Sequence, residues 1–246
     1  MSLSLLNKLQ GINNTNFVSV YVPSANKNVD FKELTVKQQK NLLSVGLQGN
    51  KAGVLLQNTI NDIIKSNITE SIVCDIYDRI PIIIALKLAS LGKKAYVSDI
   101  NNVEQSELVD ISSILTKQIV LPEKTCTLNY KDSIFIEMCV PTIDRELQIN
   151  ADYVQKMQNN NDIAAAVSEL YMYSIIKHLK SLTIEGEVVE LSSLPVQTAY
   201  KFVESLPATI NQEIIEFIQK FNKAEEEYLT IDNKRVIFDA RLFNVE

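Results

Sequence analysis

The chain has 246 residues, of which 46% are hydrophobic and 22% charged, and its formal net charge is -6 at pH 7. This composition is typical of a globular protein long enough for one large domain or two small ones. The acidic balance argues against nucleic acid as a partner, because a negative surface repels the phosphate backbone. No run of about 18 apolar residues occurs, so the sequence predicts no membrane span.

Metal binding and disulfides are not expected. The three cysteines, Cys74, Cys126 and Cys139, are dispersed and form no CxxC pair. A structural zinc site takes about four Cys or His ligands, and the chain has one histidine, His178. We therefore expect reduced thiols and no cofactor.

The first expected elements are a β-hairpin and a helix, after a short amphipathic or frayed arm over residues 1–16. Residues 17–22 are mostly β-branched or aromatic, and the polar segment that follows them is typical of a turn. Residues 29–34 alternate apolar and polar, as a half-buried strand does. Thr35 is the expected N-cap of a helix that runs to Leu43.

Further helices and short strands follow in chain order. Apolar spacing predicts a helix over 54–67 and another that begins at Asp75 or near Pro81 and stops before Gly92. Short β-type runs then occur at 96–97, 108–115, 119–121, 126–130 and 134–140, with a tight turn at Lys131-Asp132.

The pattern becomes helical again after Asn150. The expected elements are a helix over 163–182 capped by Asp162, a hairpin turning at 185–187, helices at 194–206 and 209–223 split at Pro207, and a terminal hairpin turning at Asp232-Asn233.

The sum of these elements is an α+β fold, in which helices and short antiparallel hairpins surround a small, mostly antiparallel sheet in the middle of the chain. We expect a single α+β domain over 1–246. The sequence leaves open a division into an N-terminal lobe, 17–141, and a C-terminal helical lobe with the terminal hairpin, 151–246. The segment 141–150 would then be the boundary.

Catalytic chemistry has weak support. Asp75 and Asp78, followed by Arg79, are the carboxylate pair on which a small enzyme with an unrecognised site could be built. Their place at a helix start has a simpler explanation, since the helix dipole favours carboxylates there. His178 has no nucleophile or carboxylate arranged around it by motif.

Apolar residues in the C-terminal helices are more numerous than one core face requires. Burial within the chain is the first interpretation of this stripe, and a protein-binding surface is the second. The second interpretation also admits a regulatory module that binds a peptide through residues 195–223. The candidate interface residues are Phe202, Leu206, Ile210, Ile214, Phe217 and Phe221.

Three segments resemble the T4-type bacteriophage base plate protein family of contractile-tailed phages. The first is VPSANKNVDFKELTVKQQKNLL, with its strand, Pro-Ser, polar turn, strand and helix. The second is the helix pair 54–67 and 75–91, and the third is the ending from LPVQTAYKFV to KRVIFDARLF. The matching positions are packing and turn positions, so no site residue carries over.

The resemblance implies a non-enzymatic tail morphogenesis protein that acts in base plate hub assembly. Its partners would be other hub proteins and the tape-measure protein, and its location the host cytoplasm during assembly. The resemblance leaves open a minor hub component that stays in the virion and an assembly chaperone that leaves.

Overall fold

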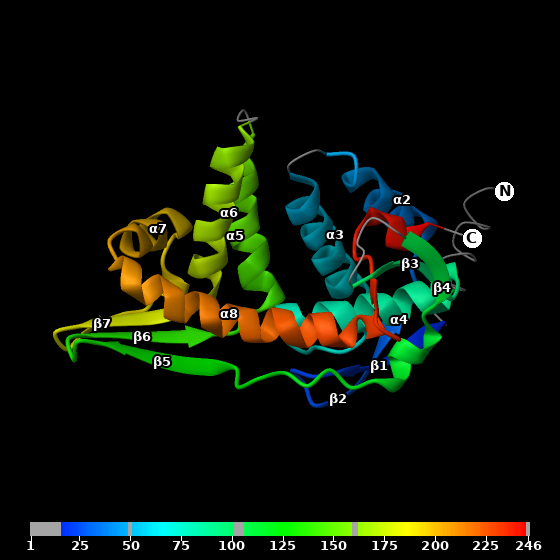
Figure 1. Ribbon diagram of the computed structural model, residues 1–246, viewed down its shortest axis with the longest axis horizontal. Helices are drawn as coiled ribbons and strands as arrows, with labels where there is room; N and C mark the ends of the chain where they lie inside the picture. The colour runs from blue at the N-terminus through cyan, green and yellow to red at the C-terminus, as the bar shows by residue number, and fades with distance from the viewer. Residues whose placement is uncertain (1–15, 49–50, 101–105, 159–161, 245–246) are drawn as a thin grey trace. The chain divides into compact units, whose positions relative to one another are not determined.

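The computed structural model describes residues 16–48, 51–100, 106–158 and 162–244 (Figure 1). The arm expected over residues 1–16 lies outside these ranges, apart from Asn16. Two compact units are present: Met1–Ile119 with Glu225–Glu246, and Val120–Ala224. The lobes expected at 17–141 and 151–246 stay a prediction. Helices and antiparallel sheets occur in both units, which confirms the α+β class.

The first unit opens with the expected hairpin and helix. Strands β1 (Phe17–Val22) and β2 (Lys27–Lys32) pair in antiparallel register. Helix α2 (Val36–Val45) follows, and Thr35 caps it as expected. The Thr35 hydroxyl accepts a hydrogen bond from the Gln38 backbone N–H at 3.2 Å, and the Gln38 side chain accepts one from the Thr35 N–H at 2.9 Å.

Helices α3 (Ala52–Asn67) and α4 (Arg79–Leu91) supply most of the apolar core of the first unit. A 3₁₀ turn, η2 (Ile76–Asp78), leads into α4. Pro81 sits within the first turn of α4, where its missing N–H costs no helical hydrogen bond. Gly92 ends α4 with φ of 100°, a conformation that glycine adopts without strain.

The second sheet of this unit joins distant segments of the chain. Its order is β4 (Ser106–Asp110), β3 (Lys94–Asp99), β10 (Lys234–Val236) and β9 (Thr230–Ile231), all antiparallel. The terminal hairpin turns at Asp232 and Asn233, as expected, and both residues have positive φ. A last 3₁₀ turn, η5 (Ala240–Phe243), follows.

The second unit contains an antiparallel sheet in the order β5 (Thr125–Tyr130), β6 (Ile134–Cys139), β7 (Leu179–Ile184) and β8 (Glu187–Val189). One face carries the buried side chains of Ile136, Met138 and Leu182. The neighbours in sequence face the other way, as the two-residue period of a strand requires.

The helices of the second unit are α5 (Ile143–Lys156), α6 (Ile163–His178) and α7 (Val196–Glu204). Helix α8 (Ala208–Tyr228) begins in this unit, and the division between the units falls within it. A 3₁₀ turn, η4 (Leu191–Ser193), precedes α7. In the part of the chain that is described, no helix is long and apolar enough to cross a membrane.

Four details of the expected secondary structure are wrong. Helix α5 occupies a segment for which the sequence predicted no element. The helix expected over 163–182 ends at His178, because the next residues pair with β6 as strand β7. The run 108–115 is a strand only as far as Asp110 and continues as the 3₁₀ turn η3 (Ser112–Thr116). Residues 119–121 form no strand.

Candidate protein-interaction site

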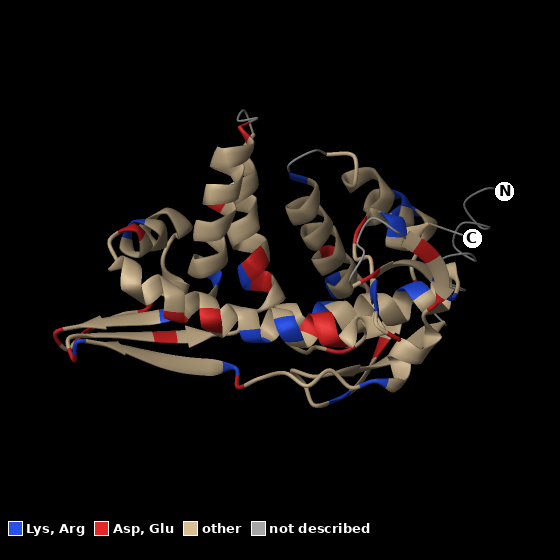
Figure 2. Cartoon of the chain, in the orientation of Figure 1, with Lys and Arg blue, Asp and Glu red and all other residues tan. Residues whose placement is uncertain are grey.

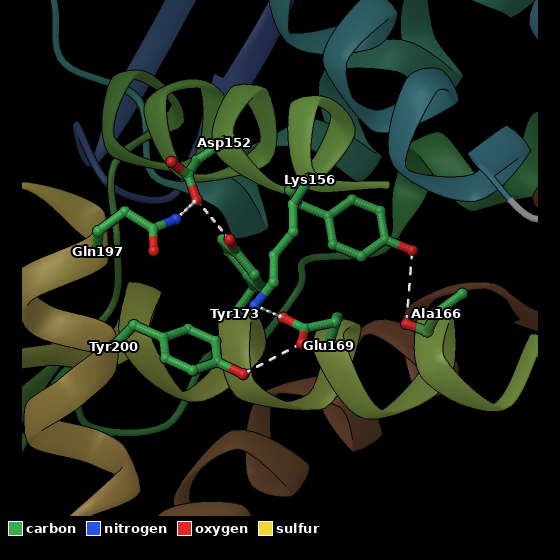
Figure 3. A network of polar contacts seen from close by, with 8 residues as sticks. Asp152, Lys156, Ala166, Glu169, Tyr173, Gln197 and Tyr200 are labelled. Carbon is green, nitrogen blue, oxygen red and sulfur yellow. Dashed lines mark hydrogen bonds and ion pairs between the residues drawn. The ribbon is translucent and has the colours of Figure 1, made fainter. Parts of the chain in front are cut away.

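The helices α5, α6 and α7 form the best-defined polar and aromatic arrangement in the second unit (Figure 3). Thr142 is the N-cap of α5, and its hydroxyl accepts a hydrogen bond from the Arg145 N–H at 3.2 Å. Asp162 is the N-cap of α6, and its carboxylate accepts one from the Ala164 N–H at 2.9 Å. These caps fix where both helices start, which sets the register of the side chains between them.

Three tyrosine rings contact one another between the helices. The rings of Tyr153 and Tyr173 meet edge to face with centroids 5.6 Å apart, and those of Tyr173 and Tyr200 lie 5.8 Å apart. Tyr153 and Tyr173 are buried. Aromatic pairs of this geometry are worth about 0.5–1.5 kcal/mol beyond the area that they bury.

Two carboxylates accept hydrogen bonds from the hydroxyl groups of Tyr173 and Tyr200. Asp152 accepts hydrogen bonds from the Tyr173 hydroxyl and, at 2.7 Å, from the Gln197 side chain (Figure 3). Glu169 accepts from Lys156 at 2.7 Å and from the Tyr200 hydroxyl at 3.2 Å. Burial, followed by the contact with Asp152, raises the pKa of Tyr173 far above its ordinary value, so this hydroxyl stays protonated and donates.

A second ion pair ties α5 to α6. The Lys177 ammonium lies 2.8 Å from a carboxylate oxygen of Glu146, and the Glu146 side chain is fully buried. A buried carboxylate without such a partner would be strongly destabilising. The polar network and this ion pair therefore hold the helices in one arrangement.

The side of α6 that is turned away from α5 and α7 is apolar and exposed. Ile163 and Val167 are 70% and 64% exposed, and Leu170 and Tyr171 are 44% and 42% exposed. Their spacing of three and four residues places them on one side of the helix. Figure 2 shows α6 almost without charge, and its acidic and basic residues, Glu169 and Lys177, are engaged in the contacts described above. We call Ile163, Val167, Leu170 and Tyr171 the α6 face.

The interface expected in the C-terminal helices is mostly buried in the chain itself. Ile210, Ile214, Phe217 and Phe221 are buried, while Phe202 and Leu206 are half-buried. The Phe217 ring packs against the rings of His178 and Phe221, with centroids 6.4 Å and 5.2 Å away. This burial favours the packing interpretation that the sequence left open. Whether a partner also contacts these residues stays a prediction.

The α6 face was missed in the sequence, although a signal for it was present. The segment IAAAVSELYMYSIIKH is apolar on all sides, which is typical of a helix covered on all sides. In the described part of the second unit, the side of α6 that carries Ile163 and Val167 is apolar but left exposed.

Of the carboxylates considered for catalysis, Asp75 is half-buried and Asp78 lies in the interior of the first unit. Asp78 is fully buried, and its carboxylate accepts backbone hydrogen bonds from Ser24 at 2.9 Å and from Asp75 at 2.7 Å. Burial raises the pKa of Asp78 above its ordinary value. Arg79 is buried beside Asn61, at 3.4 Å between the guanidinium and the amide oxygen. These contacts assign Asp78 and Arg79 to the packing around the start of α4.

The cysteines and the histidine form no site among the described residues. Cys74 is buried and Cys126 and Cys139 are half-buried, all as free thiols. No group of His, Cys, Asp and Glu in these ranges could hold a metal ion. Burial lowers the pKa of His178 to about 3, so its ring is neutral at physiological pH.

Comparison with known protein families identifies the family of the chain. A family model described as T4 bacteriophage base plate protein matches residues 14–234. The chain belongs to this family. Membership in the base plate family indicates a role associated with the base plate of a phage tail. Neither curated proteins nor solved structures gave a match.

Proposed function

We propose that the chain is a non-enzymatic tail morphogenesis protein that acts in assembly of the base plate hub, in the cytoplasm of the infected host. The match to the base plate family over residues 14–234 is the observation that carries this proposal. Two structural features support it: the polar network between α5, α6 and α7 fixes a scaffold, and the α6 face offers a binding surface on it.

We propose that the α6 face binds an apolar helix of another tail protein, and the tape-measure protein is the candidate. An exposed helix face with residues at i, i+4, i+7 and i+8 matches the anchor pattern of helix-to-helix recognition. The α6 face carries no charged side chain, so an apolar helix covers it without desolvating an ion. A charged or extended partner has no comparable complement there.

Two roles remain within this proposal. A minor hub component stays in the finished tail, whereas an assembly chaperone leaves before the particle is complete. The presence or absence of the chain in purified virions separates the two.

The alternatives from the sequence have less support. A regulatory module that binds a peptide through residues 195–223 would need an accessible apolar stripe, and much of that stripe is buried. A small enzyme built on Asp75, Asp78 and Arg79 would need both carboxylates and the guanidinium to reach a substrate, and Asp78 and Arg79 are buried while Asp75 is half-buried.

The proposal is tested during infection. A nonsense mutation in the gene for this chain, in the phage that encodes it, should leave tails without complete base plates in electron micrographs, and a supplied copy should restore them. Mass spectrometry of purified wild-type virions then assigns hub component or chaperone. Normal base plates in the mutant would contradict the proposal.

A further inference from the structure

A row of polar side chains crosses the second sheet of the first unit. Ser98 of β3 pairs directly with Ser106 of β4 on one side and with Arg235 of β10 on the other. Residues directly opposite each other in neighbouring antiparallel strands lie on the same face of a sheet. The two serines and the arginine therefore share one face of three neighbouring strands.

This face is turned away from the core residues of the same strands. Val97 and Val236 pair with each other and are buried. Because successive strand residues point to opposite faces, Ser98 and Arg235 lie on the other face. Ser98 is nevertheless only 9% exposed, so neighbouring groups enclose its polar side chain.

The polar row lines a cavity of about 370 Å³. The segment that follows it in β10 and beyond, Val236 to Phe238, and the exposed Arg241 of η5 complete the described lining. Ile237 and Phe238 are half-buried. The volume falls within the range of ligand pockets, about 300–1,000 Å³. Guanidinium groups, hydroxyl groups and apolar side chains thus border one space.

The charge of this cavity favours an anion. Its described lining contains two arginines and no acidic residue. The acidic residues Asp99 of β3 and Glu107 of β4 belong to the opposite face, because Glu107 pairs with Val97 and Asp99 lies two residues beyond Val97. A cation in the cavity would meet two positive charges without a carboxylate from the sheet beside it.

Each arginine also has a carboxylate partner outside the described lining. Arg235 Nη1 lies 3.0 Å from Glu226, and Arg241 donates to Asp239 through Nε at 2.9 Å and Nη2 at 2.6 Å. The side chains of both pairs are about half exposed, so water screens these contacts and they contribute little to stability. A guanidinium has five N–H donors, so one carboxylate leaves donors for a second anion.

A phosphate group matches these donors better than another carboxylate does. A planar carboxylate has two oxygens, and one guanidinium satisfies both in a bidentate pair. A phosphate carries a charge of about -1.5 to -2 at pH 7 and three acceptor oxygens, which suits a cavity with several separate donors. The apolar side chains of Ile237 and Phe238 in the same lining match an organic group attached to the phosphate.

We propose that this cavity binds a small organic phosphate ester. The guanidinium groups of the two arginines and the hydroxyls of the two serines hold the phosphate, and the organic part packs against Ile237 and Phe238. This inference goes beyond the proposed function, because the cavity lies in the first unit and contains no residue of the α6 face. Base plates in infected cells test the proposed function, and ligand titration tests the phosphate site.

The test is isothermal titration calorimetry of the full chain in a buffer without phosphate. The three probes are phenyl phosphate, inorganic phosphate and benzoate. Phenyl phosphate should bind about tenfold more tightly than inorganic phosphate, because its ring buries apolar area. It should also bind about tenfold more tightly than benzoate, which keeps the ring and replaces the phosphate by a carboxylate.

A pair of variants supplies the matched control. Arg235→Gln removes one charged donor and should weaken binding of phenyl phosphate about tenfold. Lys27→Gln in β2 breaks an ion pair of similar exposure outside the cavity and should leave binding unchanged. The side chains of Lys27 and Glu70 are 48% and 43% exposed, against 48% and 52% for Arg235 and Glu226. Circular dichroism checks that both variants are folded.

Glu226→Gln distinguishes a ligand site from a structural ion pair. It removes the carboxylate that competes for Arg235 and keeps a side chain of the same shape, so binding of phenyl phosphate should tighten about two- to fivefold. If Arg235 served structure alone, this variant would bind no more tightly than the wild-type chain.

Four results would overturn the inference. They are no binding of phenyl phosphate at millimolar concentration, equal affinity for phenyl phosphate and benzoate, equal affinity for phenyl phosphate and inorganic phosphate, and equal binding by the Arg235→Gln and Lys27→Gln variants.

Discussion

At the residue scale, the hydroxyl of Tyr173 donates to Asp152, a carboxylate that also accepts a hydrogen bond from Gln197. Tyr173→Phe removes its hydrogen bond to Asp152 and keeps the stacked ring. Because hydrogen bonds to a charged acceptor are worth more than neutral ones, we expect a loss of about 1–2 kcal/mol in the free energy of unfolding. Urea denaturation measures it.

The control for Tyr173→Phe is the same change at Tyr153, whose ring contacts that of Tyr173. Tyr153→Phe removes a hydroxyl whose contact with the Ala166 carbonyl is long, at 3.5 Å. We expect it to cost less than about 1 kcal/mol. An equal loss for both variants would mean that Asp152 does not organise the network.

The buried His178 predicts a dependence of stability on pH. Its pKa is about 3 in the folded chain against an ordinary 6.5, so the unfolded chain binds the proton more readily. The stabilisation is present above pH 6.5 and is lost as the pH falls toward 3. Between pH 7 and pH 5 the free energy of unfolding should drop by about 2 kcal/mol from this group.

His178→Gln removes this titration and keeps a donor for the Ser174 carbonyl, which lies 2.7 Å from Nδ1. The variant should lose most of the decline seen between pH 7 and pH 5 in urea titrations. Asp78 acts in the opposite sense, since its raised pKa favours the folded state as the pH falls. If the free energy of unfolding depends on pH in the same way in the variant, folding does not lower the pKa of His178.

At the element scale, Gly46 is required where α2 ends. A Cβ at this position would overlap the Cβ of Ala240 in η5, whereas a Cβ at Gly53 in α3 would meet no atom within 4 Å. Gly46→Ala should therefore lower the free energy of unfolding by about 1–3 kcal/mol, because backbone must shift. Gly53→Ala should be neutral or stabilising by up to about 1 kcal/mol. Thermal denaturation compares the two variants. Equal midpoint temperatures would contradict the close approach of Gly46 to Ala240.

The α6 face gives a prediction that separates binding from folding. Val167→Lys changes a side chain that is 64% exposed, so the free energy of unfolding should change by less than about 0.5 kcal/mol. Binding to a tail-protein partner should weaken about tenfold or more, since a charge would be buried in an apolar contact. Val36→Lys in α2, at a valine that is 83% exposed, is the matched control. Equal binding by both variants in calorimetry would remove the α6 face from the interface.

Sequence predicted the elements whose signals are local. The cap at Thr35 and the turn at Asp232-Asn233 depend on a few neighbouring side chains, and both were found. Helix α5 was missed because its buried stripe contains Glu146 and Asn150, so the apolar period is interrupted by polar residues. The end of α6 was misplaced because residues 179–182 suit helix and strand alike, and pairing with β6 decides.

The site was harder to predict than the fold, for a physical reason. Apolar residues at helical spacing satisfy a core and an interface equally, so Ile214 and Phe217 looked like docking residues and are buried. The exposure of Ile163 and Val167 depends on which side of α6 its neighbours cover, and that is set by packing between segments far apart in the sequence.

At the scale of the whole molecule, the chain is an acidic member of the phage base plate family, with a net charge of -6. The carboxylates of Asp78 and Glu146 are buried in the packing, whereas the α6 face is exposed and apolar. We propose this face as the surface that binds another tail protein, because exposed apolar patches mark interaction sites.

The most direct test is to co-express the tagged chain with the hub proteins and the tape-measure protein of the same phage and to weigh the purified complex by native mass spectrometry. We expect a stoichiometric complex with one of these proteins that Val167→Lys weakens and Val36→Lys preserves. A wild-type chain that purifies alone as a monomer would contradict it.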